Sequence, residues 1–98
     1  MVESISSSEF LRLLQQDSIN VLDVREEDEF NRNHLPNAIN FPVSEMGALV
    51  DDLDHNELYY IVCRTGNHSY TATEFLAGLN LNVVNVEGGM EAISASVA

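Results

Sequence analysis

The fold of this chain is decided by the stretch Leu58-Tyr59-Tyr60-Ile61-Val62-Cys63-Arg64-Thr65-Gly66-Asn67-His68-Ser69-Tyr70. Its β-branched and aromatic first half predicts a buried strand over 58–62. The apolar spacing that follows predicts a helix over 69–79, with a polar loop between the two. We expect the buried stripe of this helix to be Ala72, Phe75, Leu76 and Leu79. Cys63, the only cysteine in the sequence, then lies at the carboxyl edge of a sheet, where open α/β folds bind ligands.

This position favours a reactive role for Cys63. The thiolate is the nucleophilic form of cysteine, and helix N-termini, loop amides and neighbouring cations all favour it. The loop after Cys63 offers amides, the start of the predicted helix and the guanidinium of Arg64. The alternative is a buried thiol that packs as a small hydrophobic side chain.

The rest of the sequence alternates between strand and helix patterns. Short strands are predicted over 4–5, 20–24, 38–41 and 83–86. Further helices are predicted after a capping box of Ser6 and Glu9, over 26–31, over 46–53 with Ser44 as its cap, and over 90–95. Strands separated by helices indicate an α/β fold with a small, mostly parallel sheet and helices on both faces.

Length and composition predict one domain over residues 1–98, because 98 residues with 45% hydrophobic side chains suit a single core. No apolar run approaches the roughly 20 residues that span a bilayer, and the polar start lacks a secretory signal, so a cytoplasmic protein is expected. One cysteine excludes an internal disulfide and a Cys-x-x-Cys pair. Asp51, Asp52, Asp54 and His55 are interpreted as a solvated helix end, so no metal or other cofactor is predicted. Glu26, Glu27, Asp28 and Glu29 are interpreted as acids at a helix N-terminus, where they interact with the helix dipole.

The net charge of −12 comes from sixteen acidic residues against four arginines and no lysine. It argues against nucleic acid and anionic membranes as partners, because both require clustered cations. A basic protein partner would be favoured, although the charge can equally serve only to keep a monomeric protein in solution.

Three more segments carry recognisable patterns, in chain order: Leu22-Asp23-Val24-Arg25, His34-Leu35-Pro36-Asn37-Ala38-Ile39-Asn40-Phe41-Pro42 and Val86-Glu87-Gly88-Gly89-Met90. Together with the loop 63–69, they resemble the single-domain rhodaneses, a sulfurtransferase family. That family carries a Cys-x-x-Gly-x-Arg-Ser/Thr loop, an Asp-Val-Arg element, a Gly-His-Ile-Pro-Gly element and a Gly-Gly turn. The four matches cover most of the chain.

The resemblance implies a rhodanese-like fold and a thiosulfate sulfurtransferase-like enzyme. Sulfane sulfur would pass from a small anionic donor such as thiosulfate, or from a protein persulfide, through a persulfide on Cys63 to a thiophilic acceptor. A basic protein is a further acceptor that the charge would suit. The residues expected to bind the donor are Arg64, Thr65, Gly66, Asn67 and His68.

Asp23 and Arg25, at the end of a neighbouring predicted strand, could support the loop, although a purely structural ion pair explains them equally well. Ser69 is a further residue that could support the loop. His68 stands where many relatives carry arginine, which makes a permanent charge titratable. Asn33 and Asn37 replace two glycines beside the structural residue His34; asparagine tolerates positive φ, so these turns can form.

Two other functions remain open. A phosphatase or arsenate reductase would need an arginine six residues after the cysteine, where this chain has Ser69. A non-catalytic or sulfur-carrier module that docks on a partner protein fits the acidity of the chain and the presence of His68.

Overall fold

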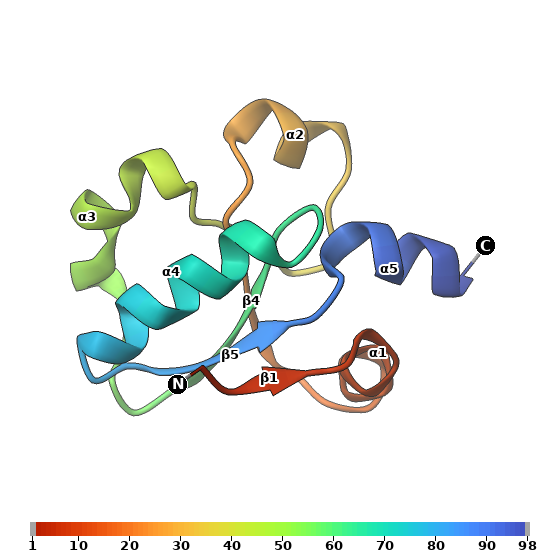
Figure 1. Cartoon of the computed structure of the whole chain (residues 1–98), viewed down its shortest axis with the longest axis horizontal. Coiled ribbons are helices and arrows are strands. Elements are labelled where there is room, and N and C mark those ends of the chain that lie inside the picture. The colour runs from red at the N-terminus through yellow and green to blue at the C-terminus, as the bar shows by residue number, and fades with distance from the viewer. Residues whose placement is uncertain (1, 98) are drawn as a thin grey trace.

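One five-stranded sheet forms the centre of the computed structural model, which describes residues 2–97 (Figure 1). The strands are β1 (Ser4–Ile5), β2 (Asn20–Asp23), β3 (Ile39–Asn40), β4 (Leu58–Val62) and β5 (Asn82–Val86). All neighbouring pairs are parallel, in the order β1-β5-β4-β2-β3, so β4 is the central strand. Parallel strands end at the same edge of a sheet, and the residues that follow β2, β4 and β5 therefore meet there.

Helices connect the strands and cover both faces of the sheet (Figure 1). They are α1 (Ser7–Gln16), α2 (Glu27–Arg32), α3 (Met46–Leu49), α4 (Asn67–Gly78) and α5 (Gly89–Val97), with 3₁₀ turns over Val43–Glu45 and Val50–Asp52. The predicted α/β class, with a parallel sheet between helices, is confirmed.

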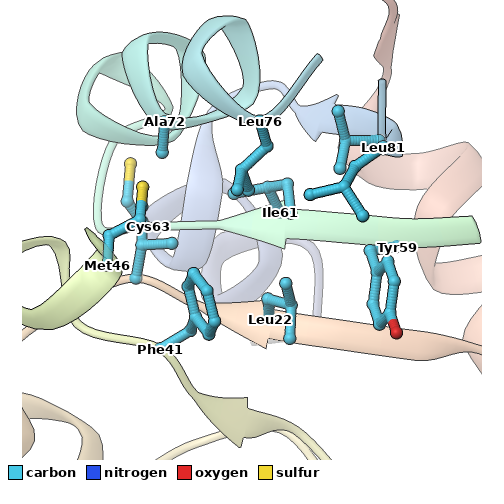
Figure 2. Close-up of a cluster of buried hydrophobic side chains, with 11 residues drawn as sticks. Leu22, Phe41, Met46, Tyr59, Ile61, Cys63, Ala72, Leu76 and Leu81 are labelled. Carbon is cyan, nitrogen blue, oxygen red and sulfur yellow. The ribbon is translucent and has the colours of Figure 1, made fainter. Parts of the chain in front are cut away.

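Alternate residues of the strands divide the core into two clusters, because successive strand side chains point to opposite faces. One face carries Leu22, Val24, Phe41, Met46, Tyr59, Ile61, Cys63, Ala72, Leu76, Leu81 and Val83, under α3 and α4 (Figure 2). The other carries Phe10, Val21, Leu35, Tyr60, Val62, Val86, Met90 and Ile93, under α1 and α5. The Cys63 side chain thus lies on the same face of the sheet as Tyr59 and Ile61, the face that α4 covers.

Helix α4 differs from its prediction in its start and in its buried face. It begins at Asn67, two residues before the predicted start. Phe75 and Leu79 are 48% and 41% exposed, so the predicted apolar stripe was wrong at both positions. The buried residues are Ser69, Ala72, Thr73 and Leu76. The buried face of α4 therefore contains the polar side chains of Ser69 and Thr73 instead of the larger hydrophobic side chains of Phe75 and Leu79.

The predicted helix over 46–53 is a short α-helix between two 3₁₀ turns, and Ser44 does not cap it. Ser44 lies inside the first turn, where its hydroxyl donates to Glu26 at 2.6 Å. At α1, Ser6 accepts the amide of Glu9 as predicted, but the Glu9 carboxylate binds Arg12 instead of closing a capping box.

The turns around His34 follow the prediction in part. Asn37 has a φ of 64°, a positive value that asparagine tolerates, whereas Asn33 is extended at −166° and does not use that tolerance. The His34 ring stacks on Phe30 at 4.0 Å, and its Nδ1 lies 2.9 Å from the Phe30 carbonyl oxygen. His34 therefore has the structural role predicted for it.

Candidate active site at Cys63

The Cys63 side chain lies where β4 ends and the loop to α4 begins. Its sulfur receives the backbone N–H of Gly66 at 3.0 Å and that of Ser69 at 3.2 Å. Gly66 reaches this position with a φ of 96°, a left-handed value that glycine adopts without strain. Two amides at the start of α4 that point at the sulfur are the arrangement that stabilises a negative charge there.

Ser69 and Asn85 form a buried polar pair beside the sulfur. The Cys63 thiol donates to the Ser69 hydroxyl oxygen at 3.2 Å, and that hydroxyl donates to the Asn85 side-chain oxygen at 2.5 Å. Ser69 is fully buried and Asn85 is 3% exposed. Thr73 donates to the Ser69 carbonyl at 2.6 Å and so holds the first turn of α4 in place.

Sequence reasoning missed Asn85, although a signal was present. Asn85 interrupts the β-branched strand Asn82–Val86, and the two-residue period places it on the same face as Val83, toward α4. A polar side chain on a buried face needs a hydrogen-bond partner, and Ser69 provides it.

The start of α5 supports the cysteine loop from behind. The amide of Met90 donates to the Cys63 carbonyl at 2.7 Å, and that of Glu91 donates to the Arg64 carbonyl at 3.0 Å. Because the N–H and C=O of a trans peptide point in opposite directions, these bonds turn the amides of Arg64 and Thr65 away from α5. The Gly88–Gly89 turn thus fixes the conformation of the loop.

Asp23 and Arg25 form a buried ion pair at the end of β2. The Arg25 guanidinium binds the Asp23 carboxylate at 2.8 and 3.0 Å, and it also donates to the Asn33 carbonyl at 2.7 Å. The hydrogen bonds to Asp23 raise the pKa of Arg25, so the guanidinium stays charged at every pH below the ordinary arginine range. Arg25 also lines the pocket that holds Cys63. The pair is therefore structural and part of the site wall as well.

The pocket over Cys63 has a volume of about 340 Å³. Its lining residues are Val24, Arg25, Glu26, Glu29, Val43, Ser44, Cys63, Arg64 and His68. Of the residues expected to bind the donor, Arg64 and His68 line this pocket, whereas Thr65, Gly66 and Asn67 are not among its lining residues. Glu26 and Glu29, interpreted from sequence only as acids at a helix N-terminus, also face the pocket.

Within residues 2–97, no three histidine, cysteine or acidic side chains gather closely enough to hold a metal ion. No helix in the same part of the chain is both long and apolar enough to cross a membrane.

Comparisons with known proteins agree with this geometry. Residues 6–96 match the family model described as Rhodanese-like domain. A rhodanese-related protein of Thermoplasma volcanium has a solved structure that superposes with a TM-score of 0.89 at 35% identity, covering 96% of this chain and 92% of that one.

Two relatives carry names that refer to sulfur chemistry. YrkF of Bacillus subtilis, named as a candidate sulfur carrier protein, is 32% identical over 91% of this chain and 49% of its own length, so this chain spans about half of that relative. Thiosulfate sulfurtransferase GlpE of Pseudomonas syringae is 28% identical over 80% of this chain and 74% of its own length. The segment that matches the family model, residues 6–96, includes the Cys63 loop, the buried ion pair and the Gly88–Gly89 turn. The chain therefore belongs to the rhodanese-like domain family.

Proposed function

We propose that this chain moves sulfane sulfur from a donor to a thiophilic acceptor through a persulfide on Cys63. The observation that carries the proposal is the pair of amides, from Gly66 and Ser69, directed at a single cysteine sulfur inside a pocket. Amides preorganised around a sulfur stabilise the anionic forms through which such a reaction passes.

The reaction takes two displacements. The Cys63 thiolate attacks the outer sulfur of the donor, a new S–S bond forms, and the old bond breaks with its electron pair on the departing sulfite or thiolate. A thiolate or cyanide then attacks the outer sulfur of the persulfide and returns Cys63 to its thiolate. These 98 residues contain no second cysteine, so the acceptor is a group outside them.

Arg64 and His68 line the pocket and are proposed to attract the anionic donor. The roles of Thr65, Gly66 and Asn67 would rest on their backbone amides, since the side chains of Thr65 and Asn67 lie outside the lining. Asp23, Arg25 and Ser69 are proposed as supporting residues.

The phosphatase alternative receives less support from the geometry. In that reaction an arginine six residues after the cysteine would clamp a tetrahedral oxyanion, but here Ser69 is fully buried and bonded to Asn85. Aryl phosphates should therefore be hydrolysed no faster by the protein than by its Cys63→Ser variant.

A sulfur-carrier role is the second candidate. It is favoured by the relative named as a candidate sulfur carrier, of which this chain spans 49%. In that role Cys63 would accept and deliver sulfur within a larger assembly, and a basic partner would suit the net charge of −12.

The test is the transfer of sulfur from thiosulfate to cyanide, measured as thiocyanate, in the protein and in Cys63→Ser. Serine is only slightly smaller than cysteine, and its hydroxyl oxygen can accept hydrogen bonds from the same two amides. The variant should therefore fold, and circular dichroism checks that it does. Transfer should be lost in the variant. Thiocyanate formation near the unmodified rate in folded Cys63→Ser would remove Cys63 from the mechanism.

A further inference from the structure

A second hollow adjoins the sulfur pocket, between α3 and α4. Its volume is about 430 Å³, and its walls include Val43, Met46, His68, Ala72 and Phe75. Val43 and His68 also line the pocket over Cys63, so the two hollows lie side by side and meet at these residues. Figure 2 shows Met46 and Ala72 grouped near Cys63 at this end of the core.

The walls of this second hollow, here called the groove, are mainly apolar and include no carboxylate. Met46 and Ala72 form a buried floor, whereas Val43 and Phe75 are each 48% exposed. Phe75 is large, yet it is turned away from the core on a helix whose buried positions include Ser69 and Thr73. An aromatic side chain exposed at the rim of an apolar hollow gives up hydrophobic stabilisation unless something covers it.

The charges around the sulfur pocket oppose a dianion. Glu26 and Glu29 face the pocket, and Arg25 is already neutralised by Asp23. Among the residues that the structure describes, Arg64 is the arginine outside any ion pair. A donor with two negative charges would meet two carboxylates, one unpaired guanidinium and the imidazole of His68, in a chain whose net charge is −12.

We propose that the groove between α3 and α4 holds the carbon part of an organic sulfane-sulfur donor, so that the site prefers small organic persulfides with an apolar group over thiosulfate. This inference rests on the proposed sulfur transfer through Cys63. The donor's outer sulfur meets Cys63, while its apolar group passes His68 and Val43 and packs on Met46, Ala72 and Phe75. Such a donor carries at most one negative charge near the reacting sulfur.

The sulfur transfer balances for all three kinds of donor. With an organic persulfide, the Cys63 thiolate forms a bond to the outer sulfur, and the organic thiolate leaves with the electron pair. With a thiosulfonate, the leaving group is an organic sulfinate, and with thiosulfate it is sulfite. Each step oxidises Cys63 to a persulfide and reduces the leaving group by the same two electrons.

Alkyl thiosulfonates are suitable probes, because they carry one charge and an apolar group that can be lengthened one carbon at a time. We would measure kcat/KM with cyanide as acceptor for thiosulfate and for methane-, ethane- and propanethiosulfonate, each divided by its uncatalysed rate with cyanide. Each methylene removed from water should raise kcat/KM about fourfold when fully buried. In a groove with one open side, the rise from methyl to propyl should be about five- to fifteenfold.

Two exposed aromatic residues of α4 provide a matched pair of variants. Phe75 lines the groove, whereas Tyr70, which is 45% exposed, does not. Phe75→Ser should flatten the dependence on chain length, and Tyr70→Ser should keep it. A third variant, Glu29→Gln, should raise kcat/KM for thiosulfate about two- to threefold more than for propanethiosulfonate, because the dianion is repelled more strongly.

A flat alkyl series, or the same slope in Phe75→Ser as in the unmodified protein, would overturn the inference. In that case a persulfide on Cys63 formed from thiosulfate would still leave the proposed function standing. If no donor loads sulfur on Cys63, the proposed function fails and the inference fails with it.

Discussion

Gly89 is the position at which one added methyl group should damage the site most. Its φ is 58°, and a Cβ built there would overlap the Cys63 carbonyl oxygen and lie 2.8 Å from the carbonyl carbon and oxygen of Arg64. An L-residue in this left-handed conformation costs about 1–2 kcal/mol. Moving the turn aside would also weaken the bonds from Met90 and Glu91 to the loop, each worth about 0.5–1.5 kcal/mol. Gly89→Ala should therefore lower the free energy of unfolding by about 2–5 kcal/mol.

Urea denaturation followed by circular dichroism measures this loss. With a slope of about 2 kcal/mol per molar urea, the midpoint should fall by about 1 M or more. Sulfur transfer should also fall under conditions in which the variant is fully folded, because the amides that face the sulfur depend on the turn.

Gly78→Ala is the matched control for this substitution. Gly78 is the last residue of α4, and a Cβ built there has no atom within 4 Å. Alanine is favoured over glycine in a helix by about 0.5–1 kcal/mol, so this variant should be as stable as the unmodified protein or slightly more so. A Gly89→Ala variant with the midpoint of Gly78→Ala would refute the argument that the turn packs directly on the loop.

Three further substitutions test the supports of the site. Asp23→Asn leaves a buried arginine without its counterion and should cost about 3–5 kcal/mol in urea denaturation, whereas Asp28→Asn, in an exposed pair 3.5 Å apart, should cost at most about 1 kcal/mol. An equal loss of free energy of unfolding in Asp23→Asn and Asp28→Asn would mean that burial of the first ion pair does not affect its contribution to stability. Ser69→Ala leaves the buried Asn85 oxygen without its donor, which should cost about 1–3 kcal/mol and reduce kcat for sulfur transfer; an unchanged kcat would contradict a role for this hydroxyl. His68→Arg places a permanent cation at the pocket and should lower the KM for thiosulfate, and an unaltered KM would show that this side chain points away from the donor.

The sheet and the position of the cysteine could be predicted because both depend on local pattern. The β-branched and aromatic run over Leu58–Val62 predicted a buried strand with Cys63 at its carboxyl end, and the fold makes this strand the central one. Three of the four resembling segments, 22–25, 63–69 and 86–90, reach the carboxyl ends of β2, β4 and β5, where parallel strands bring distant parts of the chain together.

The sequence could not show which polar groups would be buried. The stripe predicted for α4 contained Phe75 and Leu79 because an apolar count ignores specific hydrogen bonds. In the fold, Ser69 turns inward to meet Cys63 and Asn85, and this rotation carries Phe75 to the surface. The partner of Ser69 lies sixteen residues away, on strand β5, so no local pattern could indicate the pair.

The support of the cysteine loop by α5 could not be predicted either. The Gly88–Gly89 turn was recognised in the sequence, but its contact with the loop depends on the tertiary fold. The bonds from Met90 and Glu91 to the loop carbonyls join backbone groups, which carry no side-chain signature. Glu26 and Glu29 were interpreted from their place in a helix, and only the path of the chain around the sheet turned them toward the pocket.

The central claim is that Cys63 carries the transferred sulfur, and the intact mass of the protein tests it most directly. The protein would be mixed with thiosulfate or propanethiosulfonate, freed of donor, weighed by mass spectrometry and digested to locate the change, with Cys63→Ser treated in parallel. The account predicts a gain of one sulfur atom on the peptide that contains Cys63, its removal by cyanide, and no gain in the variant. A protein whose mass stays unchanged with every donor, or an equal gain in Cys63→Ser, would contradict it.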